Sequence, residues 1–184
     1  MDNGASSYRR FLDGDDYGME ELVRDYKDGL VLYLNSYLNN FSVAEDCVQD
    51  TFITLAIKKP KYRGDSSFKT WLYTIGRNTA LYYMRKHKGK GSVSIDECDK
   101  TVAEADLERD YLKEEQKITV RRAICKLKTD YQQALYLTYF EGFSYAEAGM
   151  IMKKSRKQIE NLLYNAKKSL KSELEKEGFD YEEI

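Results

Sequence analysis

Residues 144–170 read SYAEAGMIMKKSRKQIENLLYNAKKSL, and this stretch carries the strongest structural signal in the chain. It contains two capping boxes, Ser144 with Glu147 and Ser155 with Gln158. In a capping box, the hydroxyl and the side chain three residues later satisfy each other's free backbone donors at the start of a helix. The stretch therefore predicts a short helix, a turn of a few residues and a longer helix, which is the order of a helix-turn-helix motif.

The helix predicted from Ser155 has an apolar face and a polar face. The apolar side chains recur every three or four residues, which is the helical period: Ile159, Leu162, Leu163, Ala166 and Leu170. The opposite face carries Arg156, Lys157, Glu160, Asn161, Tyr164 and Lys168. The second helix of such a motif reads base edges in the major groove, while Lys and Tyr hold phosphates. We expect this polar face to contact duplex DNA, and a simple solvated face is the alternative.

The N-terminal half of the chain is also helical in its periodicity. Apolar residues within 8–40 recur at helical spacing and predict two helices that pack on the next helices of the chain. A third capping box, Ser42 with Glu45, predicts a helix that starts at Val43 and ends near Lys58. An apolar stripe in residues 66–86 predicts an amphipathic helix of about six turns.

Composition favours an all-α fold of two small helical domains. The 184 residues include a single proline and few glycines, and the formal net charge of −1 averages basic and acidic segments. Helices are also expected over about 111–127 and 130–140. We expect a first domain (1–87), a flexible acidic linker (88–110), a second domain (111–172) and an acidic tail (173–184).

Basic residues and an aromatic form a row on the helix predicted over 66–86. Lys69, Tyr73 and Arg77 lie four residues apart and share one face. With Tyr73 pointing outward, the row could track the phosphates of a DNA strand and stack on its bases. Arg85 continues the row, and Lys61, Arg63 and Phe68 in the adjoining loop strengthen this interpretation. The alternative is an ordinary amphipathic helix with a wet outer face.

An acidic face lies on the helix predicted from Val43. Asp46, Gln49 and Asp50 are three and four residues apart, and they offer charge-assisted hydrogen bonds to a partner that carries arginine. A catalytic pair is disfavoured because no nucleophile lies nearby. The three cysteines form no CxxC pair and His87 is the single histidine, so we expect no metal site, no cofactor and no catalytic residue.

Two longer segments resemble a known family. Residues 44–52, AEDCVQDTF, and 62–80, YRGDSSFKTWLYTIGRNTA, resemble the second conserved region of bacterial sigma factors of the extracytoplasmic-function (ECF) group. Residues 127–170, with YFEGFSYAE at 139–147, resemble their fourth region. Lys153 departs from the family, which usually has a turn glycine there, and Glu160 stands in a stretch that is commonly basic or hydroxylated.

The resemblance implies partners and roles for matching residues. It implies a subunit that binds core RNA polymerase and directs it to promoter DNA, without a small-molecule substrate. Asp46, Gln49 and Asp50 match the surface that docks on the clamp helices of the β′ subunit, and the fourth region matches the part that meets the β flap. A cognate anti-sigma factor is also implied.

The resemblance further assigns two DNA-reading sets. The minus-10 set, which melts and reads that element and captures a flipped base, is Lys61, Arg63, Asp65, Phe68, Lys69, Trp71, Tyr73, Arg77, Asn78 and Arg85. The minus-35 set is Ser155, Arg156, Lys157, Gln158, Glu160, Asn161, Tyr164 and Lys168.

Two other functions compete with this interpretation. A stand-alone helix-turn-helix regulator would bind duplex DNA tightly without polymerase, and an enzyme acting on nucleic acid would show metal-dependent hydrolysis. Residues 1–30 lack a signal pattern, and no apolar run approaches 18 residues, so we expect a cytoplasmic protein without membrane insertion.

Overall fold

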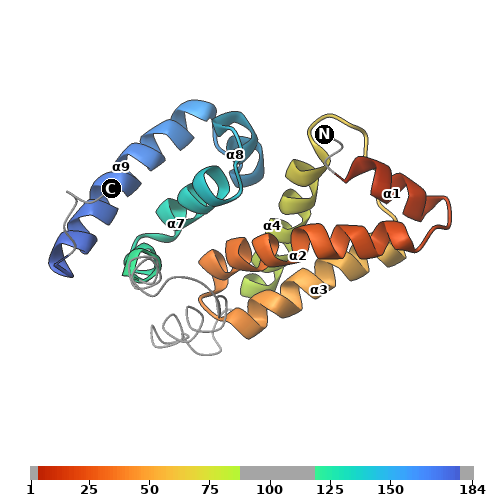
Figure 1. Ribbon diagram of the computed structural model, residues 1–184, viewed down its shortest axis with the longest axis horizontal. Helices are drawn as coiled ribbons and strands as arrows, with labels where there is room; N and C mark the ends of the chain where they lie inside the picture. Colours follow the sequence, from red (N-terminus) through yellow and green to blue (C-terminus); the bar gives the residue numbers. More distant parts are fainter. Residues whose placement is uncertain (1–3, 88–118, 179–184) are drawn as a thin grey trace, which may run out of the picture.

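The computed structural model describes residues 4–87 and 119–178, and every regular element in these two ranges is a helix (Figure 1). The first range contains α1 (Ala5–Leu12), α2 (Tyr17–Leu38), α3 (Phe41–Lys58) and α4 (Phe68–Lys86). The second contains a helical stretch at 119–125, α7 (Thr129–Leu135), the π-helix η2 (Tyr136–Phe140), α8 (Tyr145–Met152) and α9 (Arg156–Lys176). The predicted all-α fold is confirmed. The predicted linker over 88–110, the first part (111–118) of the helix predicted over 111–127, and the residues from 179 onward lie outside the described ranges.

Helix α3 begins earlier than its predicted capping box. The side chain of Asn40 accepts a hydrogen bond from the Val43 backbone N–H at 2.9 Å, and the helix starts at Phe41. The prediction of a start at Val43, capped by Ser42, is therefore wrong. Asn caps helices as well as Ser does, and the Asn stands two residues earlier in the chain.

The helix predicted over 130–140 changes its winding halfway. Its first part is α7, and its last turn is the π-helix η2, in which the Glu141 N–H donates to the Tyr136 carbonyl at 3.0 Å. A π-turn shifts the faces of the residues after it relative to a regular α-helix. The loop that contains Glu141 and Phe143 leaves the helix from this turn.

The helix-turn-helix forms as the two capping boxes predict. Both the Ser144–Glu147 box at α8 and the Ser155–Gln158 box at α9 are complete. Lys153 adopts a left-handed conformation with φ 56°, so it takes the place of the glycine that is usual at this turn. A side chain at Gly149 would come within 2.6 Å of the Lys154 carbonyl oxygen, so the chain needs glycine there.

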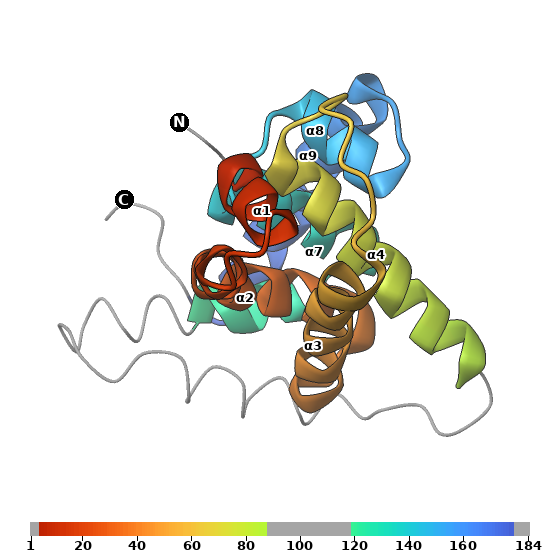
Figure 2. The same cartoon turned by 90° about the vertical axis from the view of Figure 1, so that its right-hand side faces the viewer.

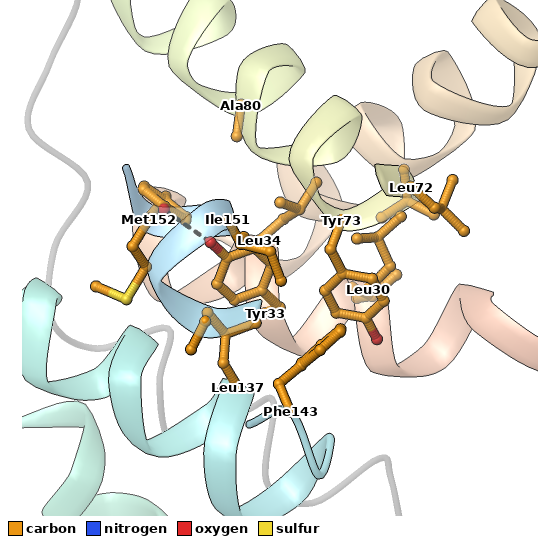
Figure 3. Packing of buried hydrophobic residues seen from close by; sticks show 14 of the residues in the cluster. Leu30, Tyr33, Leu34, Leu72, Tyr73, Ala80, Leu137, Phe143, Ile151 and Met152 are labelled. Atoms are coloured by element: carbon orange, nitrogen blue, oxygen red, sulfur yellow. Dashed lines mark hydrogen bonds between the residues drawn. The ribbon is translucent and has the colours of Figure 1, made fainter. Parts of the chain in front are cut away.

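The two predicted domains pack against each other. Helices α1 to α4 form one bundle, and α8 lies beside α4 in both ribbon views (Figures 1 and 2). Figure 3 shows Tyr33 and Leu34 of α2 next to Leu137 of η2 and Ile151 of α8. A single buried cluster therefore runs through both domains.

Candidate polymerase and DNA interfaces

The polar face of α9 is open to solvent. Arg156, Lys157, Glu160, Asn161, Tyr164 and Lys168 are all exposed, and Tyr164 is 73% exposed. Ile159, Leu163 and Ala166 are buried on the opposite side, which holds the helix in one rotational position. The Lys157 Nζ and a Glu160 carboxylate oxygen lie 3.1 Å apart in an exposed ion pair. The helix thus presents its first turns as a surface that a DNA groove can accept.

An aromatic and basic pair that joins η2 to α9 was not predicted from the sequence. The Nζ of Lys167 lies 5.0 Å from the centroid of the Tyr139 ring, and a hydrogen bond to the Tyr139 side chain raises the pKa of Lys167. The contact places a lysine of α9 against an aromatic ring of η2. Tyr139 lies in the π-helix η2, and no spacing of residues along the chain indicates this contact with Lys167.

The acidic face of α3, called here the α3 docking face, consists of Asp46, Gln49 and Asp50. All three side chains are exposed, while Ala44 and Val48 are buried on the other side of the helix. A cavity of about 420 Å³ lies beside this face, between α2 and α3. Its lining mixes acidic, basic and apolar side chains: Val23, Lys27, Glu45, Asp46, Val48, Gln49 and Phe52. The α3 docking face therefore adjoins a hollow with apolar lining, which the residue spacing did not predict.

The loop before α4 and the far end of α4 present polar groups to solvent. Lys61, Arg63 and Asp65 are exposed in the loop, and Asn78 and Arg85 are exposed on the helix. Two aromatic residues of the predicted set are not accessible. Phe68 is 1% exposed and Tyr73 is 0% exposed, so the expectation that Tyr73 points outward is wrong.

The burial of Phe68 has a clear cause in the first domain. Its ring lies 5.5 Å from that of Tyr8, 5.5 Å from that of Tyr62 and 5.4 Å from that of Trp71, centroid to centroid. Tyr8 in turn donates a hydrogen bond to the Pro60 carbonyl at 2.7 Å, which fastens the loop to α1. This aromatic cluster fixes the position of the loop that carries Lys61 and Arg63.

The residues Lys69, Tyr73 and Arg77, called here the α4 row, contact the second domain. The Tyr73 hydroxyl donates to Oε2 of Glu141 at 2.6 Å, and the Lys69 Nζ lies 2.9 Å from the same oxygen. The Lys69 Nζ also donates to the Glu141 carbonyl at 2.7 Å. Arg77 donates from Nε to the Tyr37 hydroxyl at 2.9 Å and from a terminal nitrogen to the Met152 carbonyl at 3.5 Å.

Tyr73 remains a hydrogen-bond donor under all ordinary conditions. Burial raises the pKa of its hydroxyl well above the usual value, and the nearby Glu141 carboxylate raises it further. A proton on Tyr73 is what allows it to donate to Glu141.

Two further observations concern the part of the chain that the structure describes. None of its helices combines the length and the apolar character that a membrane crossing requires. Over residues 4–87 and 119–178, His, Cys, Asp and Glu side chains do not gather into a group that would hold a metal ion.

A helix-turn-helix with an open polar face, together with a helical bundle that bears exposed acidic and basic residues, is typical of a helical DNA-binding protein. Comparison with known protein families identifies the kind of DNA-binding protein. Residues 22–90 match the model of sigma-70 region 2, and residues 117–170 match that of sigma-70 region 4.

Several characterised proteins are similar along most of their length. RNA polymerase sigma factor YlaC of Bacillus subtilis (strain 168) is 31% identical over 160 residues, which cover 86% of this chain and 92% of that protein. ECF RNA polymerase sigma factor SigM of the same organism is 29% identical over 154 residues, covering 84% of this chain and 93% of SigM.

Solved structures share the fold. The sigma factor RpoE, in complex with the anti-sigma factor NepR from Bartonella quintana, aligns with a TM-score of 0.64 and 22% identity over 85% of this chain and 96% of that one. CnrH, in complex with the cytosolic domain of CnrY, aligns with a TM-score of 0.63 and 21% identity over 94% of this chain and 95% of that one.

The chain belongs to the sigma-70 family, in its ECF group. It is an alternative sigma factor, which binds core RNA polymerase and promoter DNA and directs transcription initiation.

Proposed function

We propose that the α3 docking face binds the clamp helices of the polymerase β′ subunit. The exposure of Asp46, Gln49 and Asp50 supports this role, because exposed carboxylates bind arginine through charge-assisted hydrogen bonds. The adjoining cavity of about 420 Å³ offers room for an apolar side chain of the partner. The second domain, proposed as residues 111–172, also meets the β flap.

The minus-10 element is read and melted by the loop before α4 and by α4 itself, within a first domain that spans residues 1–87. The exposed groups Lys61, Arg63, Asp65, Asn78 and Arg85 contact the DNA directly. Lys69 and Arg77 also contact the DNA after the second domain has moved away from α4. Phe68 and Trp71 belong to the same site as the aromatic support of the loop, and they lie near the position where a flipped base is captured. Tyr73 belongs to the site through its place between Lys69 and Arg77 on α4.

The minus-35 element is read by α9. Arg156 and Lys157 lie in its first turn, where side chains reach base edges, and Ser155 and Gln158 hold that turn in place. Glu160, Asn161, Tyr164 and Lys168 complete the face. Glu160 accepts from a cytosine amino group or repels phosphate, so the promoter sequence of relatives does not transfer to this chain.

The chain works as a cytoplasmic subunit that performs no chemistry of its own, and a cognate anti-sigma factor restrains it. The sigma factor RpoE, which shares the fold, was solved in complex with an anti-sigma factor, and this supports the last point. The linker over 88–110 lets the two domains reach two DNA elements, and the residues 173–184 form an acidic tail that starts within the end of α9.

Transcription from identified promoters tests the proposal as a whole. Sequencing of transcripts after a pulse of overexpression identifies the promoters through their shared upstream elements. Run-off transcription from these promoters is then expected when the chain and core polymerase are both present, and absent when either is left out. Failure of the chain to bind core polymerase would overturn the proposal.

The docking face is tested by Asp50→Arg. Reversal of an exposed charge should abolish binding to core polymerase and leave the circular dichroism spectrum unchanged, because Asp50 contributes nothing to the core. Glu175→Arg, an exposed charge reversal on α9, is the matched control and should bind core polymerase as the wild type does. Retained core binding by Asp50→Arg rejects this role.

The minus-35 assignment is tested by Arg156→Ala and Lys157→Ala. Loss of a contact to a base should cost about 1–3 kcal/mol of discrimination at one promoter position. Run-off transcription from promoters that vary in the minus-35 element measures this cost. If both variants keep the promoter preference of the wild type, the register assigned to α9 is incorrect.

A further inference from the structure

The α4 row is covered by the second domain at each of its three residues. Glu141 takes hydrogen bonds from Lys69 and Tyr73, and the Met152 carbonyl takes one from Arg77. Further along the contact, the hydroxyls of Ser67 and Thr70 lie 3.2 and 3.4 Å from Oε1 of Glu147. The side-chain donors of the α4 row are therefore already used within the chain.

Glu141 offers α4 the same chemistry that a phosphate group would. Its carboxylate is anionic, its Oε2 accepts from two donors at 2.6 and 2.9 Å, and its side chain is only 15% exposed. The Phe143 ring closes the site from one side, with its centroid 4.8 Å from the Lys69 Nζ and 5.0 Å from the Tyr73 ring. Figure 3 shows Phe143 and Tyr73 side by side in the buried cluster.

The first domain has room for this carboxylate because residue 29 is glycine. A Cβ added at Gly29 would lie 2.3 Å from Oε1 of Glu141 and 2.6 Å from the Tyr73 hydroxyl. Glycine in the middle of a helix is unfavourable relative to alanine, so α2 gives up helical stability at the point where Glu141 approaches it. The site of Glu141 is thus formed by α2 and α4 together.

We propose that this arrangement is an autoinhibited closed state, in which Glu141 occupies the place of a DNA phosphate on α4. The inference rests on the proposed minus-10 role of the α4 row. The α3 docking face and the polar face of α9 stay exposed in the closed state, so polymerase can bind before the domains separate. Reading of the minus-10 strand requires Glu141 to leave, and a nucleic acid strand competes with it for Lys69.

Two substitutions open the closed state without altering a residue of either DNA-reading set. Glu141→Gln keeps the size of the side chain and removes its charge. Gly29→Ala places a methyl group against Glu141 and Tyr73, and it should strengthen α2 by itself because alanine is the better helix former. Glu175→Gln is the matched control, since it removes one exposed carboxylate of α9.

The test uses the full chain and consists of two measurements. Small-angle X-ray scattering should give Glu141→Gln and Gly29→Ala a larger radius of gyration than the wild type and the control. Fluorescence anisotropy with a labelled oligothymidylate at low salt reports strand binding independent of sequence. The two variants should bind about tenfold more tightly if the open fraction rises from about one tenth to nearly all molecules.

Each outcome has a separate meaning. An unchanged radius of gyration together with unchanged oligothymidylate affinity in both variants overturns the closed state as an inhibitory device. Opening without a gain in affinity overturns the claim that Glu141 masks a strand-binding surface. Core polymerase binding by the wild type, measured in parallel, tests the sigma factor assignment itself and does not depend on Glu141.

Discussion

Gly149 is the residue on which the geometry of the helix-turn-helix depends most directly. A Cβ at this position would lie 2.6 Å from the Lys154 carbonyl oxygen, and backbone atoms cannot rotate away as the end of a side chain can. The Lys154 N–H donates to the Gly149 carbonyl at 2.9 Å, so the turn is held close to α8. A methyl group here must therefore push the turn away from the helix.

We expect Gly149→Ala to lower the free energy of unfolding by about 1–3 kcal/mol, the usual cost of overpacking. Urea denaturation followed by circular dichroism measures this loss. The control is Met150→Ala at the exposed neighbouring position, which should change stability little. Helical propensity alone predicts the opposite result, a gain of about 1 kcal/mol for alanine over glycine. A higher free energy of unfolding for Gly149→Ala would show that the turn can move enough to accommodate the methyl group.

The α4 row shows what residue spacing can and cannot predict. The spacing of four correctly placed Lys69, Tyr73 and Arg77 on one face of a helix, because that relation is local. It could not reveal that Glu141, 72 residues beyond Lys69 in the chain, covers this face. Tyr73 therefore turned out to be buried by a contact between distant segments, which periodicity does not encode.

The capping boxes are the elements that the sequence predicted best. Each is a reciprocal contact between residues three apart, and both boxes of the helix-turn-helix are present at Ser144 and Ser155. The start of α3 was missed because Asn40 and Ser42 are both good caps, and local chemistry does not choose between them. The π-turn η2, which contacts α2, was missed because the helical period of the residues does not distinguish it from a regular α-helical turn.

The first box makes the stability of α8 depend on pH. A hydrogen bond from the Ser144 hydroxyl, and a further one from the Ser144 N–H, lower the pKa of Glu147 below its ordinary value of 4.5. A carboxyl group with a lowered pKa in the folded state stabilises the fold above its unfolded pKa. This stabilisation is lost as the pH falls from 4.5 through the folded-state pKa.

Glu147→Gln should therefore be less stable than the wild type at neutral pH, with a difference that shrinks below pH 4.5. Thermal unfolding by circular dichroism across this range measures the difference. Glu160→Gln provides a control, because its exposed partner Lys157 lies on the open face of α9. A gap between wild type and Glu147→Gln that stays constant with pH would contradict the linkage.

At the scale of the whole molecule, the buried cluster joins the two domains, for which we propose separate DNA elements. Leu30, Tyr33 and Leu34 of α2 are completely buried, and they share the cluster with Leu137 and Ile151 of the second domain. Apolar contact of this kind is not directional, so it holds the domains together without fixing how they separate. The polar contacts of Glu141 and Glu147 supply the specific alignment. Residue patterns predicted both domains, but they contained no indication that the domains pack on each other.

This shared core predicts cooperative unfolding of the two domains. Differential scanning calorimetry of the wild type should show a single transition, because loss of one domain exposes the buried face of the other. Phe143 is 5% exposed and contacts Tyr73 across the domain contact.

Phe143→Ala should weaken the domain contact by about 3 kcal/mol or more, the range for removal of a buried Phe side chain, and split the transition into two. Phe52→Ala removes a similarly buried Phe within the first bundle, so it should lower the transition temperature while the transition stays single. A single, equally sharp transition in Phe143→Ala would mean that the domains remain joined without this contact. Two transitions in the wild type would mean that they unfold independently from the start.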